Sequence, residues 1–335
     1  MTASHCSAQP VTLEITLAPP DLRHVEHVLP HQLGTWAQQV AEILCVVDRR
    51  PIPGRPDASW ELDGERLVEL VDACCDQYPH AHRRTVDYEA DMARAVGAMF
   101  FNGTPPPAKT YRGGPFYAYF FGLYAARHDH VLHLDSDIMF GGRSQTWLEE
   151  AMRLLGERPN VLVFQPFPGP PKADGRVYAA GAEREPGPIH TLRFRTITTR
   201  YFLMSRNRLR ERVGGLGIRS HSPVLTKVGF DVWLRGIRDL PLRDRLRPLT
   251  LATPRIDLPE RLLGEAMVAA GMHRVDYLGR EPGMWTLHPR ERTETYFRIL
   301  PELVARIERG DVTEQQRGHY DLHETMLQRD SSSRS

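Results

Sequence analysis

The sequence contains two aspartates, Asp135 and Asp137, whose spacing suggests that they bind a cation together. They follow the apolar run of residues 131–134 and are separated only by Ser136. Two acids at positions i and i+2 of a strand point to the same side, and a turn at the strand end can direct both at one ion. Such a pair suits Mg²⁺ or Mn²⁺ that holds a diphosphate. The alternative is a plain surface turn, because Asp and Ser favour turns.

The segments around these acids predict a parallel sheet. Three segments have the patterns of a strand, a helix and a second strand, in this order: residues 11–17, 24–40 and 43–47. This βαβ unit pairs its strands in parallel. Asp48 follows the second strand, and residues 131–134 predict another buried strand. Asp48, Asp135 and Asp137 are therefore expected at strand carboxyl ends, where α/β folds bind their ligands.

The rest of the chain alternates between helical and extended patterns. Helices are expected at residues 65–75, 113–127, 146–155, 261–270 and 291–309, the last one reset at Pro301, and strands at residues 161–165, 196–204 and 275–278. The aromatic stripe within residues 113–127 is interpreted as a packing face. The four arginines of residues 206–212 either meet an anionic acceptor or form a solvated basic face. The polar tail, residues 328–335, is expected to be disordered.

The charge balance argues against a nucleic-acid partner. The 335 residues include 43 Lys and Arg against 42 Asp and Glu, a formal net charge of +1. Only three of the basic residues are lysines, a bias that fits a GC-rich bacterial genome and also supplies bidentate phosphate-binding groups.

Cysteine usage and the lack of apolar segments point to a soluble cytoplasmic protein. The four cysteines show no metal-ligand spacing, and two of them are adjacent, so we expect reduced thiols. The first residues lack the basic and apolar regions of a signal peptide. No apolar stretch approaches the length of an integral membrane segment.

Four features occur in an order that resembles a known family. They are Asp48 after a strand, Arg112-Gly113-Gly114 before a helix, the Asp135-Ser136-Asp137 turn, and an acidic helix start, Pro259-Glu260, that runs into Ala270-Gly271. This order resembles the GT-A nucleotide-sugar glycosyltransferases, particularly the inverting family 2. The resemblance covers roughly residues 10–290 and implies an α/β GT-A fold, with a mixed, mostly parallel sheet flanked by helices.

The resemblance also implies a division of the chain. Residues 10–142 would form the donor-binding half and residues 143–310 the acceptor-binding half of the same GT-A domain. Residues 311–335 would be a C-terminal extension that ends in the disordered tail.

On the donor side, the resemblance assigns four residues. Asp48 would accept a hydrogen bond from the donor's base, although it is nearly as well explained as a strand-end turn. Arg112 lies where a helix start and an arginine favour phosphate. Asp135 would contact the donor's ribose or sugar and share the metal, which Asp137 would bind directly. The metal would offset the charge that develops as the nucleoside diphosphate leaves.

The resemblance places the general base on Glu260, counted back from Ala270-Gly271, with Glu265 as the fallback. These two acids would project from different faces of a helix, so at most one reaches the acceptor. His288 resembles a histidine that some GT-A enzymes use as a further metal or diphosphate ligand, and imidazole suits Mn²⁺ better than Mg²⁺. Trp285, close to it, either stacks on a sugar or belongs to the core.

The sequence also departs from the family pattern. Arg49 replaces the usual second acid after Asp48, Ile138 replaces a third acid after Asp137, and Pro259 replaces the first acid of the acidic pair. The usual basic element of the nucleotide-side helix appears as Ala118-Tyr119-Phe120. These departures mark a divergent member and affect the base-binding contacts most.

We therefore expect a metal-dependent glycosyltransferase (EC 2.4 class). It would move a sugar from a UDP- or GDP-sugar to an acceptor hydroxyl or amine, with inversion, using Mn²⁺ or Mg²⁺. The alternatives are an Asp-x-Asp hydrolase of the phosphatase type and a catalytically inactive GT-A-like binding protein. A nucleotidyltransferase is disfavoured, because residues 11–21 lack a glycine-rich loop with a basic residue.

Overall fold

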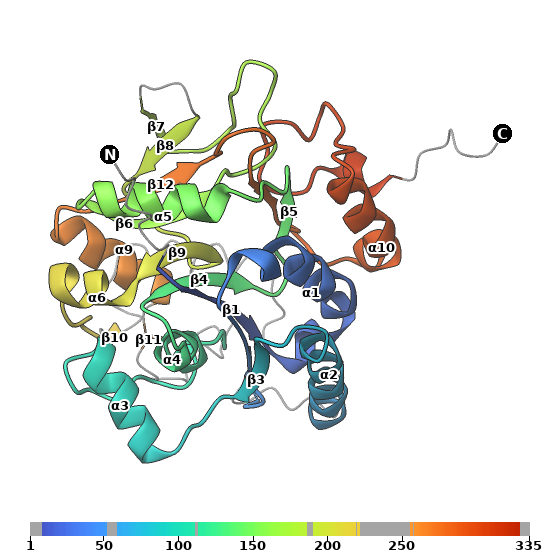
Figure 1. Ribbon diagram of the computed structural model, residues 1–335. Coiled ribbons are helices and arrows are strands. Elements are labelled where there is room, and N and C mark those ends of the chain that lie inside the picture. The colour runs from blue at the N-terminus through green and yellow to red at the C-terminus, as the bar shows by residue number, and fades with distance from the viewer. Residues whose placement is uncertain are drawn as a thin grey trace, which may run out of the picture.

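The computed structural model describes residues 9–51, 59–110, 113–185, 190–218, 220–221, 255–256 and 258–328. Its centre is a mixed sheet with helices on both faces (Figure 1). In spatial order, the nine strands of this sheet in the described part of the chain are β3 Ala81–Thr85, β2 Glu42–Val47, β1 Val11–Leu17, β4 His130–Asp135, β9 Tyr201–Ser205, β6 Val161–Pro166, β12 His273–Tyr277, β8 Thr191–Phe194 and β7 Glu183–Arg184.

Most of these strands run in the same direction. β3, β2, β1 and β4 pair in parallel, and β6 pairs in parallel with β12. β9 lies antiparallel between β4 and β6, and β8 is antiparallel to β12. The mixed, mostly parallel sheet that the family resemblance implied is thereby confirmed.

Both faces of the sheet are buried, which explains the continuous apolar runs of β2, β6 and β9. On one face the core contains side chains from α1 (Leu22–Trp36), α2 (Trp60–Cys75) and α5 (Trp147–Glu157). On the other face it contains side chains from α3 (Ala90–Phe100), α4 (Tyr117–Ala125) and α9 (Pro259–Ala269). β2 shows the pattern clearly, since Cys45 belongs to the first core and its neighbours Leu44 and Val46 to the second.

Two smaller pairings complete the described architecture. β5 (Met139–Gly141) pairs antiparallel with β13 (Trp285–Leu287), and the third core cluster joins both to α10 (Glu294–Glu308). β10 (Ser220–His221) pairs antiparallel with β11 (Arg255–Ile256). The β5–β13 pair matters for the site, because it joins the segment after Asp137 to the segment before His288.

The predicted elements are largely confirmed, with instructive exceptions. The first strand, the helix after it and the second strand form as expected, and the aromatic side chains of α4 are buried. The prediction that Pro301 resets the last helix is wrong, because α10 runs through it. The strand expected at residues 196–204 begins only at Tyr201. The short strands β3, β5, β7, β8 and β13 were missed, and the polar tail lies almost entirely outside the described residues.

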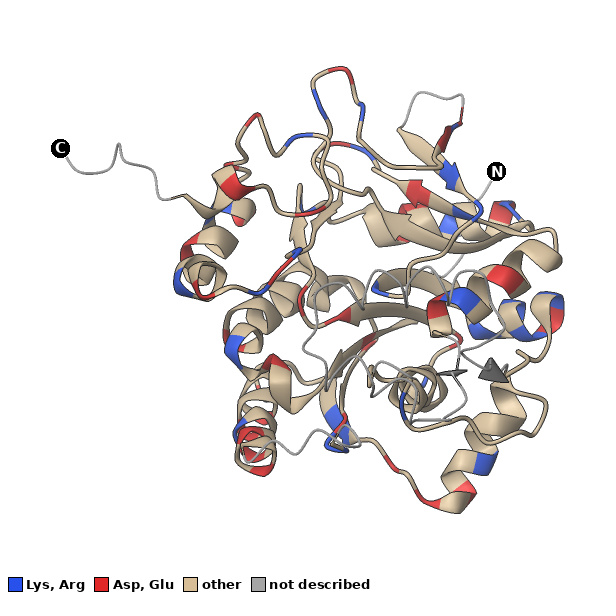
Figure 2. Ribbon diagram, turned by 180° about the vertical axis from the view of Figure 1, so that it is seen from behind, with Lys and Arg blue, Asp and Glu red and all other residues tan. Residues whose placement is uncertain are grey.

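Acidic and basic residues are interspersed along the elements in the view from behind (Figure 2). Within the described ranges, none of the helices combines the length and the apolar character that crossing a membrane requires.

The β5–β13 pair depends on a close approach at Gly141. A Cβ atom there would lie 2.0 Å from the ring of Trp285, which is 6% exposed. We therefore expect Gly141→Ala to lower the free energy of unfolding by about 1–3 kcal/mol, as overpacked sites do. At Gly156, in the exposed part of α5, a Cβ atom would meet no other atom within 4 Å. Gly156→Ala is the matched control and should raise stability by about 0.4–1 kcal/mol. Urea unfolding measures the free energy of unfolding of both variants. Equal changes in this free energy for Gly141→Ala and Gly156→Ala would contradict the packing argument.

Candidate functional site

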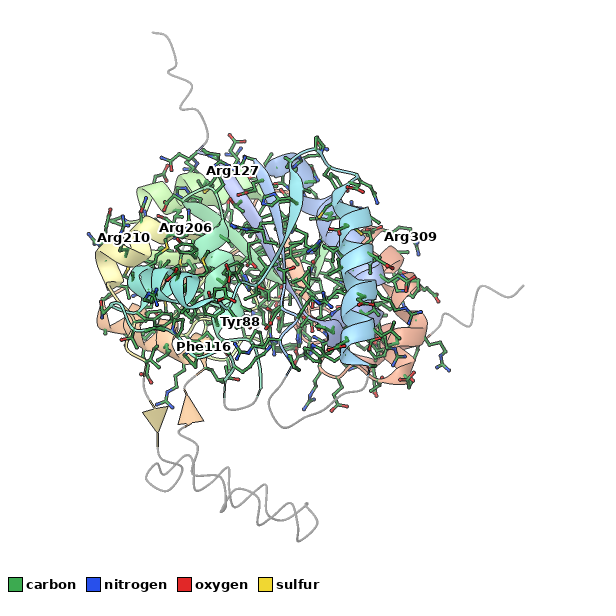
Figure 3. The ribbon with its side chains drawn as sticks, turned by 90° about the horizontal axis from the view of Figure 1, so that it is seen from below. Tyr88, Phe116, Arg127, Arg206, Arg210 and Arg309 are labelled. Carbon is green, nitrogen blue, oxygen red and sulfur yellow. The ribbon has the colours of Figure 1, made fainter. Side chains whose placement is uncertain are left out.

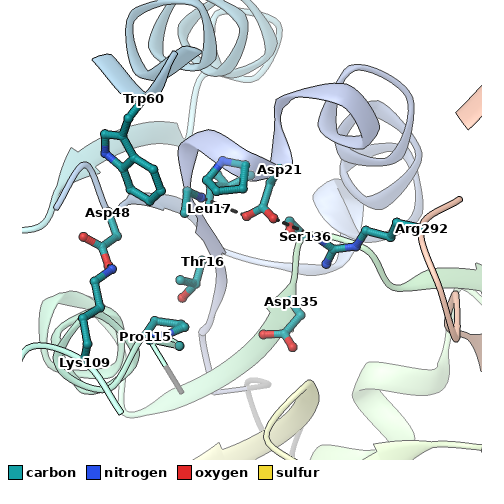
Figure 4. A pocket seen from close by; sticks show the side chains of 14 residues that line it. Thr16, Leu17, Asp21, Asp48, Trp60, Lys109, Pro115, Asp135, Ser136 and Arg292 are labelled. Carbon is teal, nitrogen blue, oxygen red and sulfur yellow. Dashed lines mark hydrogen bonds and ion pairs between the residues drawn. The ribbon is translucent and has the colours of Figure 1, made fainter. Parts of the chain in front are cut away.

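A cavity of about 350 Å³ lies at the carboxyl ends of β1, β2 and β4, and we call it the strand-end cavity. Its lining combines acidic, basic and small residues: Thr16, Leu17, Ala18, Pro20, Asp21, Asp48, Trp60, Lys109, Gly113, Gly114, Pro115, Asp135, Ser136 and Arg292. Asp48 and Lys109 lie at one end, and Asp135, Ser136 and Arg292 at the other (Figure 4). The sheet thus brings two of the predicted acids to one cavity, as parallel strand ends require.

At the first end, Asp48 already has several partners. Its Oδ2 accepts from Lys109 Nζ at 2.6 Å, and its Oδ1 accepts from Tyr88 Oη at 2.9 Å and from the backbone N–H of Arg50 at 3.0 Å. The side chains of both Asp48 and Lys109 are buried. The carboxylate is therefore rigidly held. Lys109 was missed as part of the site, although it stands only three residues before Arg112-Gly113-Gly114, because its proline-rich loop has no periodic pattern that would place it beside Asp48.

At the other end, Asp137 lies beside two residues from the far end of the chain. Its Oδ2 is 2.6 Å from Arg292 Nη2 and 3.4 Å from His288 Nε2, and its side chain is 5% exposed. Burial alone would raise the pKa of Asp137, but the hydrogen bond from His288 and the charge of Arg292 outweigh it and hold that pKa well below its usual range. The structure therefore brings Asp137 and His288 together, while Asp135 faces the cavity with its side chain 43% exposed.

The C-terminal segment contributes to this end of the site. The ring of Tyr320 stacks on the ring of His288 at 5.6 Å, and Asp321 Oδ1 is 3.6 Å from His288 Nδ1. Backbone hydrogen bonds from His288 to Tyr320 and from Leu322 to His288 hold the two segments in register. The family resemblance implied only a C-terminal extension here, and the residues of this segment carry no recognisable motif.

Helix α1 holds the acidic turn from behind. His24 Nε2 is 2.9 Å from Ser136 Oγ, and Gln32 Nε2 donates to the backbone oxygens of Asp135 and Ile138, both at 2.9 Å. Burial, together with the charge of Arg292, lowers the pKa of His24 to about 3, so this imidazole is neutral at physiological pH. The turn is thus fixed by uncharged contacts.

Asp21 is the third carboxylate at this end. Its Oδ2 accepts from the backbone N–H of Ala18 at 2.9 Å, and its Oδ1 is 3.3 Å from Arg292 Nη1. Burial raises the pKa of Asp21 to about 6, although the Arg292 charge opposes this shift. One guanidinium therefore bridges Asp21 and Asp137.

The donor set suits a divalent cation only in part. A carboxylate oxygen of Asp137 and Nε2 of His288, 3.4 Å apart, are donors that Mn²⁺ accepts, whereas the unpartnered Nδ1 of His288 faces Asp321 on the other side of the ring. Within the described ranges, no three His, Cys, Asp or Glu side chains are grouped so that they could hold an ion. In the described part of the chain, Asp137 and His288 thus provide two neighbouring donor atoms that could contribute to a cation site.

A second cavity, of about 430 Å³, lies across Arg200 from the first, and we call it the side cavity. Glu260, Arg200, Arg274 and Tyr320 belong to its lining. The backbone oxygen of Arg200 accepts from the Asp135 N–H at 2.6 Å, so the side cavity adjoins the strand-end cavity. Burial against the cavity wall raises the pKa of Glu260, while Arg200 and Arg274 oppose the shift.

Glu265, the other acid of the same helix, has a different environment. Its Oε1 accepts from Arg261 Nε at 2.8 Å in an i,i+4 pair, and both side chains are largely exposed. It lines a separate surface groove of about 610 Å³ that it shares with Glu260. Glu260 is therefore the only one of the two that also lines the side cavity.

Three other sequence-based interpretations can now be assessed. Arg112 lies outside the described residues. Trp285 is a core residue packed against Gly141 and does not line either cavity. Neither interpretation of the basic segment holds for Arg206 and Arg208, because they donate to backbone oxygens at the ends of α4 and α5, among them those of Leu123, Tyr124, Leu155 and Arg158. Figure 3 places Arg206 and Arg210 at one margin of the molecule.

Comparison with known proteins finds distant likenesses among solved structures. No protein-family model matches the chain, and neither does any curated protein sequence. A mycobacterial protein is similar over 89% of this chain and 73% of its own, at 13% identity and a TM-score of 0.34. GalNAc-T7, solved with UDP, GalNAc and Mn²⁺, is similar over 88% of this chain and 49% of its own, at 12% identity and a TM-score of 0.36. TarS from S. aureus is similar over 60% and 48%, at 12% identity and a TM-score of 0.33.

This chain thus spans about half the length of the GalNAc-T7 and TarS chains. At such low identities and TM-scores the likeness is remote, and any statement on function has to be argued from the site residues.

The raised pKa of Asp21 makes a testable contribution to stability. Its value of about 6 in the folded protein exceeds the ordinary 3.8, so folding favours the protonated form. The contribution of Asp21 is therefore fully present below about pH 4 and is lost as the pH rises to about 6. Relative to Asp21→Asn, we expect the wild type to lose roughly 3 kcal/mol of unfolding free energy over this interval. Urea unfolding at several pH values measures it, and a constant difference between the two proteins would contradict the burial argument.

Proposed function

We propose that this chain is a metal-dependent glycosyltransferase that moves a sugar from a nucleoside diphosphate to a hydroxyl or amine of an acceptor, with inversion. The observation that carries the proposal is the strand-end cavity, which has acids at both ends and the Asp137–His288–Arg292 cluster at its border. An elongated ligand with one polar group at each end suits this arrangement better than a compact phosphate ester does.

On the donor side, the cavity divides into two ends with different chemistry. The end at Asp48 and Lys109 offers fixed hydrogen-bonding groups beside Trp60, which suits a base. The end at Asp135 and Arg292 suits ribose and diphosphate, since guanidinium groups pair well with phosphate oxygens. We place UDP- or GDP-sugars here, with Arg112 as a further phosphate contact.

Asp137 and His288 would hold the divalent cation, Mn²⁺ or Mg²⁺, with Asp135 next to it. When bound, the cation would neutralise charge on the departing nucleoside diphosphate. The residues of the chain prepare this site, since Asp137 stays ionised and Asp321 and Tyr320 orient His288 from the other side. Arg292 supplies a second positive charge, which can move from Asp137 to a phosphate oxygen.

On the acceptor side, we assign the side cavity to the acceptor and Glu260 to the general base. Glu260 lies on the wall of that cavity, and Arg200 connects the wall to the Asp135 backbone. A raised pKa brings a carboxylate closer to the working pH of a base that takes a proton from a hydroxyl. The donor half would thus be residues 10–142 and the acceptor half residues 143–310, with the C-terminal extension closing the metal end.

Removal of the Asp137 carboxylate tests the donor side. Because Asp137 would be a direct metal ligand, Asp137→Asn should reduce metal-dependent release of nucleoside diphosphate from a UDP- or GDP-sugar by at least about a hundredfold. Asp129 lies just before β4, at the end of that strand away from Asp137, and it lines neither cavity. Asp129→Asn is therefore the matched control.

The measurement is nucleotide release with and without Mn²⁺, together with calorimetric binding of UDP and GDP. A wild type that binds neither nucleotide with the metal would refute the donor assignment. Hydrolysis of simple phosphate esters would favour the Asp-x-Asp phosphatase, and binding without turnover would favour the inactive binding protein.

Separate variants of the two acids of α9 test the base. We expect Glu260→Gln to lower kcat for transfer by about 10²- to 10⁴-fold with little change in donor KM, because a general base acts only in the transition state. Glu265→Gln should change kcat little, because that carboxylate pairs with Arg261 at the surface. The measurement is steady-state kinetics of both variants with an acceptor to which the wild type transfers the sugar. The reverse pattern would move the role of base to Glu265.

A further inference from the structure

A glutamate and a histidine lie in direct contact inside the core beneath the acidic turn. Glu14 of β1 and His133 of β4 are both 0% exposed, and Glu14 Oε2 contacts His133 Nδ1. Thr16 Oγ1 donates to the other oxygen of Glu14 at 2.9 Å. This cluster belongs to none of the roles assigned above.

The strand register places Glu14 and His133 two residues before two residues that line the strand-end cavity. In the parallel β1–β4 pairing, Glu14 is opposite His133 and Thr16 is opposite Asp135. Because side chains two residues apart in a strand share a face, all four project to the same side of the sheet. Thr16 and Asp135 both line the strand-end cavity, so the buried pair supports two residues of its wall.

The second nitrogen of the imidazole is directed at Asp135. His133 Nε2 is 3.6 Å from Asp135 Oδ1, and it is a buried atom without any hydrogen-bond partner within the described residues. The ring is held in place by its neighbours, stacked on Phe202 at 5.0 Å and met edge-on by Tyr119 at 4.9 Å. The imidazole therefore has little freedom to turn away from Asp135.

The pair requires a glycine in the helix above it and is not expected to stabilise the fold. A Cβ atom at position 122 of α4 would lie 2.4 Å from Glu14 Oε1, so only glycine fits above the carboxylate. Buried ionic pairs seldom stabilise a fold more than apolar side chains of equal volume. His133 is a polar residue among the buried apolar side chains of β4, so its presence there calls for a role beyond packing.

We propose that His133 is a positioning residue that holds the Asp135 carboxylate in its direction toward the strand-end cavity, and that Glu14 fixes the imidazole for this task. The chain of contacts runs from Glu14 Oε2 through the two ring nitrogens to Asp135 Oδ1. Partners of this kind behind a ligand-binding side chain commonly decide affinity. The consequence for nucleotide binding rests on the function proposed above.

Two substitutions of His133 separate positioning from packing. The amide nitrogen of asparagine takes the place of Nδ1, so His133→Asn keeps the donor for Glu14 and removes the group that faces Asp135. The amide nitrogen of glutamine takes the place of Nε2, so His133→Gln keeps the group that faces Asp135. A role in packing alone predicts similar behaviour for both variants.

The first readout needs no nucleotide. In protein labelled with ¹³C at the aspartate carboxyl carbons, the Asp135 resonance is assigned by its loss in Asp135→Asn. We expect this resonance to shift and broaden in His133→Asn and to stay near its wild-type position in His133→Gln. An unchanged resonance in His133→Asn, or equal changes in both variants, would overturn the proposal.

The second readout is the affinity for UDP or GDP in the presence of Mn²⁺. We expect His133→Asn to weaken it by about 10- to 100-fold and His133→Gln to restore most of the loss. A shifted resonance with unchanged affinity would also overturn the proposal. A wild type that binds neither nucleotide would refute the proposed function, while the Asp135 resonance would still decide the positioning role.

Two further variants guard against a failure to fold. Glu14→Met/His133→Leu removes both polar partners at similar volume, which avoids a lone buried charge and should preserve the melting temperature. It should show the same loss as His133→Asn, and wild-type behaviour of this folded double variant would overturn the proposal. Tyr277→Phe is the control, because it removes a buried hydrogen bond to Glu150 of 2.5 Å that touches neither cavity. It should leave the Asp135 resonance and the affinity unchanged.

Discussion

The short antiparallel pairing of β5 with β13 is the constraint on which the rest of the site depends. It joins the chain just after Asp137 to the chain just before His288, about 150 residues later. The ring of Trp285 lies against the backbone of Gly141, so any side chain at position 141 would clash with it and disturb the pairing. The pairing thereby places His288 and Arg292 beside the acidic turn, and hydrogen bonds of β13 and its flanks to Phe167 and Tyr320 support it from the other side.

Arg292 then sets the charge balance at that end of the cavity. Its guanidinium reaches Asp137 and Asp21 together, so the two carboxylates share one cation. Burial dominates at Asp21 and raises its pKa, whereas at Asp137 the hydrogen bond from His288 and the charge of Arg292 outweigh burial and lower the pKa. His24, although close by, remains neutral because it is buried beside that same charge. The site thus keeps Asp137 ionised although its side chain is buried.

The strand–helix–strand unit could be predicted from the sequence, because alternating and helical apolar patterns report burial directly. The same reasoning placed Asp48 and Asp135 at strand ends, and the structure confirms that both line one cavity. The three-residue strand β5 was missed, since so short an extended segment has no period to detect. Arg208 was misread as solvent-facing or ligand-binding because its backbone-oxygen partners are distant in sequence.

The sequence by itself determined which residues can carry charge and where the main strands end, because local patterning and strand-end acids are properties of short segments. Only the tertiary structure decided which of them meet. Asp137 and His288 adjoin through a β pairing, Glu14 and His133 through strand register, and Glu260 differs from Glu265 through the cavity that it faces. Such contacts depend on the packing of the whole sheet, and no local pattern encodes them.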